Sequence, residues 1–272
     1  MAKQESTDTG GIKQIGIVTG YELLKYLRRR RLYAVLAITA VVTVLIFAVP
    51  LALHTPFPQE AKQWAASYLG FANLLIIIAG AFFAGDAVSS EFEQKTGFII
   101  FPNPVKRTSL VLGKFFAAFL SALLTVALYY LIGVIGLLGI YGLVLPEMLT
   151  SFGYAILYLC SVLGLTFLFS TIMKGSMGAT LLAFFTLFMI MPIASQVITL
   201  TGNEPWYLTT YASGMITQSI NPQTDAVMEF PGSPFKIYVF YPKFPISLLV
   251  MLAYFVLGLA LSLALINRKE MA

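Results

Sequence analysis

Six long apolar stretches, separated by shorter polar segments, dominate the chain. They lie at 32–53, 68–86, 110–140, 149–172, 176–200 and 246–267. A bilayer core of about 30 Å is crossed by roughly 20 helical residues, because each residue of an α-helix rises about 1.5 Å. The stretches match that length or exceed it. The pattern therefore predicts an all-α membrane protein, with six transmembrane helices in a single transmembrane domain, 1–272.

The third stretch carries glycines near its far end, at Gly133, Gly136, Gly139 and Gly142. Sharp changes of helix direction often occur at glycine, and a span longer than the bilayer is thick can also tilt. We predict one third span that bends or frays over these glycines.

A segment of mixed character, 12–31, precedes the first span. Its apolar and charged residues fall on different helical faces; the apolar set is Ile17, Tyr21, Leu24 and Leu27, and the charged set is Glu22, Lys25 and Arg28. This pattern predicts an N-terminal amphipathic helix along the cytoplasmic membrane interface, with its arginines near lipid phosphates. The alternative is a helix that extends the first span into water.

The longest segment between spans, 201–245, is rich in proline and aromatic residues. A disordered linker would hold fewer aromatic residues. Before the last span we predict short external helices, around 205–220, that re-enter the outer leaflet or lie on it. Irregular backbone at membrane depth has to be buried in protein or to line a cavity, so this segment could gate an external exit. The alternative is an aromatic belt that anchors the protein at the interface.

The composition agrees with a membrane protein. Hydrophobic residues make up 58% of the chain and charged residues 11%, whereas about a quarter of a soluble domain is charged. A soluble enzyme and a disordered chain are therefore disfavoured. No nucleic acid is expected as a partner, because the basic run Arg28–Arg31 stands directly before an apolar stretch and is typical of a membrane boundary.

The basic residues also predict the orientation. With a cytoplasmic N-terminus, 14 of the 17 Lys and Arg residues lie inside, and Lys62, Lys236 and Lys243 lie outside. Cytoplasmic loops carry the excess of Lys and Arg in membrane proteins. We therefore expect a multi-pass protein of the cell membrane, in contact with membrane lipids, with both termini in the cytoplasm.

No catalytic set is found along the chain. The sequence has one histidine, His54, and one cysteine, Cys160, so a metal site of the His/Cys type is not expected. Gly113-Lys114 is followed by Phe115, where a P-loop needs Ser or Thr. We expect no cofactor on this chain and no ATPase site of its own.

The spans carry no charge near their middle, which disfavours ion-coupled transport. Weakly polar residues do occur at depth, and those considered as possible contacts along a substrate pathway are Asn73, Tyr129, Tyr158, Thr186 and Gln196. Such residues also form hydrogen bonds between helices, which is the alternative interpretation.

The segment 86–107 is the most distinctive polar stretch, since it combines three acids and three bases with the apolar run Phe98–Phe101. Its first part predicts a short amphipathic helix that docks into a groove on a cytoplasmic partner; the residues expected at the docking surface are Glu91, Phe92, Glu93, Lys95, Gly97 and Phe98. Gly97 can end this helix. Pro104 sets a rigid turn, and Lys106 and Arg107 are expected at the lipid phosphates. The alternative is a loop that folds back on the membrane.

These residues resemble a known family. The segment around 86–114 is similar to the cytoplasmic loop of type-2 ABC exporter permeases. The matching residues are Asp86, Ser90-Glu91, Glu93 to Gly97, Pro104-Val105-Lys106-Arg107 and Gly113-Lys114. Glu22, Lys25, Leu27, Arg28 and Arg30 resemble the charged N-terminal helix of that family. The sequence departs from the family at Lys95-Thr96-Gly97-Phe98, where Gly-Thr-Leu is commoner.

The resemblance implies the membrane subunit of an ATP-driven exporter. Separate ABC nucleotide-binding subunits would carry ATP and Mg²⁺, and a second copy or a related permease would complete the pathway. The uncharged, aromatic and Met-bearing spans suit an apolar or amphipathic cargo, such as a lipid-like molecule, a drug or a peptide. The rival interpretation is a non-transporting membrane anchor or signalling subunit that recruits a cytoplasmic ATPase, because the same docking segment serves both functions.

Overall fold

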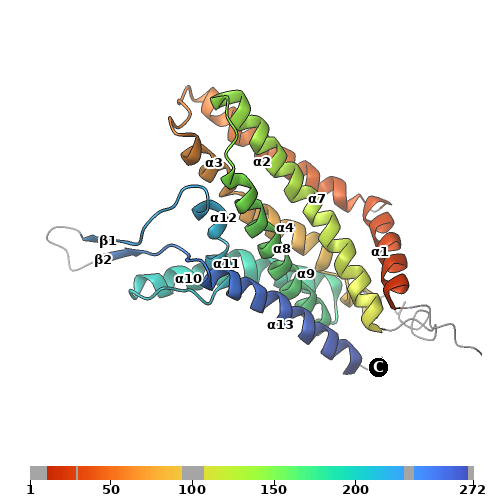
Figure 1. Cartoon of the computed structure of the whole chain (residues 1–272). Coiled ribbons are helices and arrows are strands. Elements are labelled where there is room, and N and C mark those ends of the chain that lie inside the picture. Colours follow the sequence, from red (N-terminus) through yellow and green to blue (C-terminus); the bar gives the residue numbers. More distant parts are fainter. Residues whose placement is uncertain (1–10, 29, 94–106, 230–235, 269–272) are drawn as a thin grey trace, which may run out of the picture.

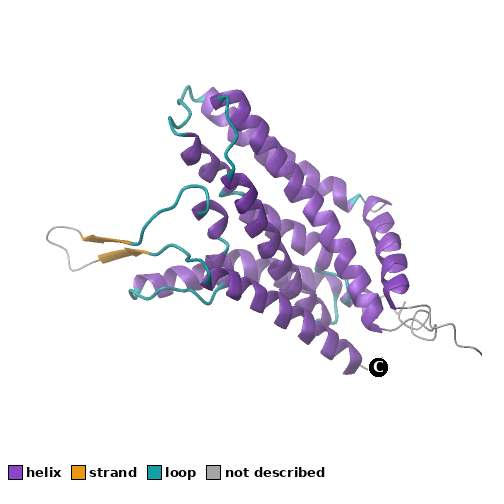
Figure 2. Ribbon diagram, viewed as in Figure 1, coloured by secondary structure: helices purple, strands orange, loops and turns teal. Residues whose placement is uncertain are grey.

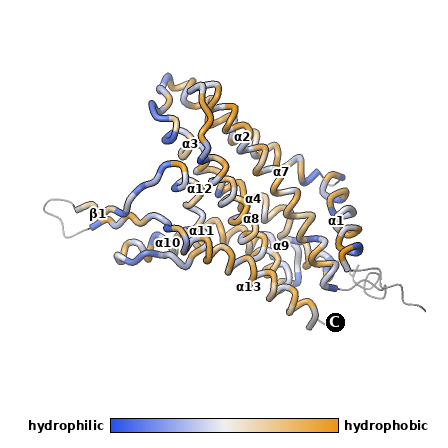
Figure 3. The backbone as a smooth tube through the Cα atoms, viewed as in Figure 1, coloured by the Kyte–Doolittle hydropathy of each residue, from blue (hydrophilic) through white to orange (hydrophobic). Residues whose placement is uncertain are grey.

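The computed structural model describes residues 11–28, 30–93, 107–229 and 236–268, and most of them are helical (Figure 1; Figure 2). Six helical segments in this part of the chain are long and apolar enough to cross a membrane, which confirms the predicted all-α membrane fold. The orange, hydrophobic colouring in Figure 3 follows these segments along most of their length.

The N-terminal half begins with two helices, α1 (Gly11–Arg28) and α2 (Arg31–Ala52). Arg30 separates them, because its φ of 58° is left-handed and interrupts the helical backbone. The 12–31 helix is therefore a separate element and not an extension of the first span. It packs along the start of α7 (Arg107–Tyr141), beside which it lies in Figure 1.

The second span has two parts, α3 (Ala61–Leu69) and α4 (Ala72–Ala84), and is followed by the short α5 (Ser89–Glu93). The predicted stretch 68–86 misses most of α3. One face of α3 is buried through Trp64 and Tyr68, while Lys62 and Gln63 are exposed. The polar residues on the exposed face interrupt the apolar run in the sequence, so the predicted span began too late along the chain.

The third span, α7, is a single helix, as predicted, and it runs past three of its glycines to Tyr141. It ends before Gly142, whose φ is 68°. A Cβ atom at Gly133 would lie 2.6 Å from Tyr68 Cε1, and one at Gly136 would lie 2.6 Å from Phe47 Cζ. The helix therefore ends beside the last of the four glycines, where a frayed end was expected, while Gly133 and Gly136 make room for aromatic rings of other helices.

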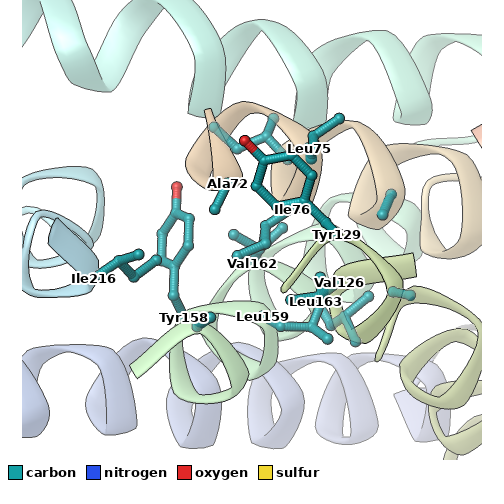
Figure 4. Close-up of a cluster of buried hydrophobic side chains, with 14 of the residues drawn as sticks. Ala72, Leu75, Ile76, Val126, Tyr129, Tyr158, Leu159, Val162, Leu163 and Ile216 are labelled. Atoms are coloured by element: carbon teal, nitrogen blue, oxygen red, sulfur yellow. The ribbon is translucent and has the colours of Figure 1, made fainter. Parts of the chain in front are cut away.

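The C-terminal half places α8 (Glu147–Ile172) against α13 (Ile246–Arg268), α4 and α7. Figure 4 shows part of the resulting core, in which Tyr129, Tyr158 and Val162 lie among aliphatic side chains. Between α8 and α13 the backbones meet at two glycines, since a Cβ atom at Gly258 would lie 2.5 Å from the Gly164 carbonyl carbon.

The fifth span comprises α9 (Ser176–Phe185), a π-helical turn η1 (Thr186–Ile190) and α10 (Met191–Leu200). The π turn ends two residues before Pro192, which has no backbone N–H to donate within a helix. Only 11% of the apolar window of this span is buried, against 67% for α8. One chain therefore leaves most of its fifth span uncovered.

The segment before α13 contains the short helices α11 (Thr209–Ala212) and α12 (Met215–Gln218), within the range where short helices were expected. It also holds an antiparallel hairpin, β1 (Ala226–Glu229) and β2 (Lys236–Val239), which was not predicted. Lys243 Nζ contacts Asp225 Oδ2 at 2.8 Å and Glu204 Oε2 at 3.2 Å, and its hydrogen bond holds the pKa of the Asp225 carboxyl below its usual range. This charged cluster ties the base of the hairpin to the start of the segment.

Candidate coupling site

The short helix α5 lies where the beginnings of α7 and α9 meet the end of α8. The backbone N–H groups of Val88 and Ser89 both donate to Ser170 Oγ, at 3.0 Å and 3.2 Å. Ser170 belongs to the last turn of α8 and is fully buried. A single hydroxyl thus satisfies two N–H groups at the start of α5 and fixes this helix to α8.

Glu91 of α5 points inward and not toward solvent. Its Oε1 lies 2.5 Å from Lys114 Nζ, and only 12% of the Glu91 side chain is exposed. Lys114 is 2% exposed, donates to Ala87 O at 2.8 Å and contacts Glu22 Oε1 at 3.2 Å. Two carboxylates and a carbonyl therefore surround one buried ammonium, which satisfies the three donors of a lysine.

The helix α1 enters this arrangement through a close contact with α7. A Cβ atom at Gly113 would lie 2.6 Å from Val18 Cβ. The Thr19 hydroxyl is shared between Ile15 O of its own helix at 2.8 Å and Gly113 O at 3.1 Å. Gly113 lets α1 approach closely enough for Glu22 to reach Lys114, and Lys25 pairs with Glu22 at 3.0 Å. The neighbouring Gly113 and Lys114 thus have complementary roles, one steric and one electrostatic.

A second ion pair joins α2 to the segment before α5. Arg31 donates to both carboxylate oxygens of Asp86 at 2.6 Å, in a bidentate arrangement. Paired guanidinium and carboxylate groups of this geometry form strong, directional hydrogen bonds. With the Glu22–Lys114–Glu91 group, this pair connects α1, α2 and α7 to α5, and we call these five residues the ion-pair network.

Glu93, at the end of α5, is exposed and touches the fifth span. Its Oε2 accepts the backbone N–H of Ser176 at 2.8 Å. Ser176 is the first residue of α9, whose preceding Gly175 provides no side-chain cap. A carboxylate at this position satisfies an orphan N–H and complements the positive end of the helix dipole. Glu93 therefore caps α9 from another element.

The structure separates the residues expected at the docking surface. Glu91 and Phe92 are partly buried and Glu93 is exposed, whereas Lys95, Gly97, Phe98, Pro104 and Lys106 lie outside the described residues. Arg107 Nη1 donates to Ile266 O near the end of α13 at 3.3 Å. Sequence analysis missed the pairing of Glu91 with Lys114, although a lone lysine at the start of an apolar run indicates a buried partner of opposite charge.

The possible pathway residues are not brought together in one cavity. Tyr129 and Tyr158 are buried in the core (Figure 4), and Tyr129 Oη donates to Tyr68 O at 2.5 Å. Thr186 lies in the π turn and Gln196 is exposed on α10. Asn73 is partly buried on α4, and its Oδ1 has no hydrogen-bond partner within the described part of the chain.

Comparison with known proteins places these observations in a family. The family model of ABC-2 family transporter proteins matches residues 20–191, which is more than half of the chain. A comparison with curated proteins found no match. The matched range begins in α1, ends at the start of α10 and contains the whole ion-pair network together with Glu93. The chain belongs to the ABC-2 family of transporters and is a multi-pass membrane permease subunit of an ABC transporter.

Proposed function

We propose that this permease couples ATP hydrolysis on separate nucleotide-binding subunits to the export of an apolar or amphipathic molecule. The observation that carries the proposal is the position of α5. It is attached at once to α7 through Glu91, to α8 through Ser170 and to α9 through Glu93. A partner that moves α5 would therefore move three spans.

The proposed mechanism begins at the cytoplasmic face, where we place α5 and the ion-pair network. ATP and Mg²⁺ would bind on the partner subunits, which would dock on the 86–107 segment at Glu93, an exposed residue of α5. ATP can shift the conformational equilibrium of the permease only if the nucleotide-bound partner binds one of two permease conformations more tightly than the other. When the partner displaces α5, Glu91 would displace α7 through Lys114, and Glu93 would displace the start of α9. The spans would then move as rigid bodies.

Exchange of Glu93 for arginine tests the docking step. In tagged permease purified from native membranes, Glu93→Arg is expected to lower the amount of co-purified ABC ATPase at least tenfold, because the charge facing the partner is reversed. Glu60→Arg is the matched control, since Glu60 is also exposed and stands before α3, at the other end of the second span. Equal recovery of the ATPase with both variants would contradict the proposal.

We further propose that two permeases, identical or related, enclose the pathway along their fifth spans. The core of one chain is closed by Tyr129 and Tyr158, while Ile193 and Val197 are each 56% exposed on α10. In the Cys160→Ser background, Ile193→Cys should give disulfide-linked dimers on mild oxidation of membranes. Val41→Cys on α2, at a residue 58% exposed, serves as the control. Cross-linking of Val41→Cys but not of Ile193→Cys would place the interface elsewhere.

The second candidate function is a membrane anchor or signalling subunit that recruits the ATPase without transport. A transporter needs a cavity for its cargo, and the core of the single chain is closely packed. If the interface between two chains is also closely packed, the anchor or signalling function is favoured. The two functions differ in one measurable property, since only an exporter moves a fluorescent amphipathic dye across vesicle membranes when ATP is supplied.

A further inference from the structure

We propose that the outer end of α2 and α3 forms a binding site for a hydrocarbon chain of a bilayer lipid. An apolar pocket of about 450 Å³ lies between these two helices and the loop that joins them. Residues of α2 such as Leu45 and Val49 form one wall, Trp64 and Tyr68 of α3 form the other, and Phe57 closes the end. This pocket lies at the end of the spans opposite α5.

The lining of the pocket is almost entirely hydrocarbon and aromatic surface, and its two hydroxyl groups are engaged within the protein. The hydroxyl of Ser67 donates to Gln63 O at 2.9 Å, within its own helix. The hydroxyl of Tyr68 donates to Tyr129 O at 2.9 Å, which is a main-chain atom of α7. A water molecule would need two or more polar partners, and a polar ligand would need at least one. The predominantly apolar lining therefore favours an apolar occupant.

The wall formed by α3 is rigid, because its aromatic rings form a stack that is anchored to α7. Trp64 stacks on Tyr68 with ring centroids 5.3 Å apart, and Tyr68 stacks on Tyr129 at 4.4 Å. The two tyrosines exchange hydrogen bonds, each hydroxyl reaching the carbonyl of the other residue. A wall held in this way cannot collapse into the space beside it, so that the pocket persists unless something fills it.

The mouth of the pocket identifies the source of the occupant. Leu45, Val49 and Phe71 line the pocket and are also 46–53% exposed on the outside of the chain. These residues belong to the first two spans of a membrane protein, so the medium at the mouth is the acyl-chain region of the bilayer. An apolar void loses van der Waals contacts along its lining, and a lipid chain can restore them without leaving the membrane.

The size of the pocket agrees with part of an acyl chain. An apolar cavity of about 150 Å³ binds benzene; three times that volume accommodates a hydrocarbon segment on the order of 10 to 18 carbons. This inference concerns the lipid around the protein and does not depend on ATP, on the partner or on the transported cargo.

Quenching of Trp64 by brominated lipid tests the site. The chain has two tryptophans, so Trp206→Phe leaves Trp64 as the only one. This protein is reconstituted in phosphatidylcholine vesicles and in vesicles of the same lipid brominated in the acyl chain. Although Trp64 is only 4% exposed, we expect brominated lipid to remove at least half of its emission, because a chain in the pocket lies against the indole.

Filling the pocket supplies the decisive comparison. Val49→Phe places a ring at the pocket wall and should at least halve the quenching. Val44→Phe, on the same helix at a residue 62% exposed that does not line the pocket, should leave it unchanged. Ser67→Leu fills the pocket from α3 and is the second variant if Val49→Phe does not elute as folded protein. Equal quenching in filled and control variants, or no quenching at all, would overturn the proposal, including the case in which a second protein chain covers the site.

Discussion

Lys114 is the residue that holds the candidate coupling site together through the largest number of contacts. Its ammonium is almost completely buried and is neutralised by Glu22 of α1 and Glu91 of α5. A buried charge is tolerated only when its partners are in place, and removing one member leaves the others uncompensated. The residue thus makes the packing of α1 and the position of α5 mutually dependent.

Replacing Lys114 with methionine should therefore lower the stability of the protein by about 3 kcal/mol, because Glu91 loses its counter-charge and Glu22 keeps only Lys25. The additional change Glu91→Gln should recover part of this loss by removing the uncompensated charge of Glu91. Thermal unfolding in detergent measures both effects. Lys174→Met, at an exposed lysine, is the control, and an unchanged melting temperature in Lys114→Met would show that the ion pairs contribute nothing.

At the residue scale, the sequence drew attention to Glu91 and Glu93 but did not reveal their contacts. Glu91 and Glu93 were expected on one docking surface, yet they are two positions apart in a helix and so face different directions. Glu91 turns to Lys114 and Glu93 to Ser176. The partners come from segments 23 and 83 residues away along the chain, and no local pattern encodes such a pairing.

At the scale of elements, the apolar pattern predicted the spans well because bilayer thickness sets their length. The irregular places were harder to predict because they depend on tertiary contacts. Gly133 and Gly136 predicted a bend or a frayed end of α7, and what the sequence did not indicate is that they make room for Tyr68 and Phe47. The hairpin was missed although Pro231-Gly232 stands between two runs rich in β-branched and aromatic residues, which is a turn signal.

The contact between α8 and α13 gives a test of this packing with an internal control. Gly164→Ala places a methyl group against backbone atoms of α13, with Phe255 O at 2.8 Å from the new Cβ, and should cost about 1–3 kcal/mol. Gly153→Ala in the same helix meets nothing within 4 Å and should be neutral or slightly stabilising, because alanine favours helix. Equal unfolding temperatures for both variants would contradict the close contact.

At the scale of the whole molecule, the two ends of the spans differ in character. The end that carries α5 holds the ion-pair network, whereas the opposite end holds the apolar pocket and the β-hairpin. The fifth span joins these ends along one uncovered face and is capped at its start by Glu93. Force applied at α5 would therefore reach the face along which we propose that the second permease packs.

The most direct test of this account is site-specific photo-cross-linking in native membranes. A photoreactive amino acid at position 93 should capture a protein that contains a nucleotide-binding P-loop, identified by mass spectrometry of the cross-linked band. The same amino acid at Leu149, which is 77% exposed near the start of α8, should capture none. Capture of the ATPase at position 149 but not at position 93, or the absence of an ATPase from both, would contradict the claim that α5 is the coupling element.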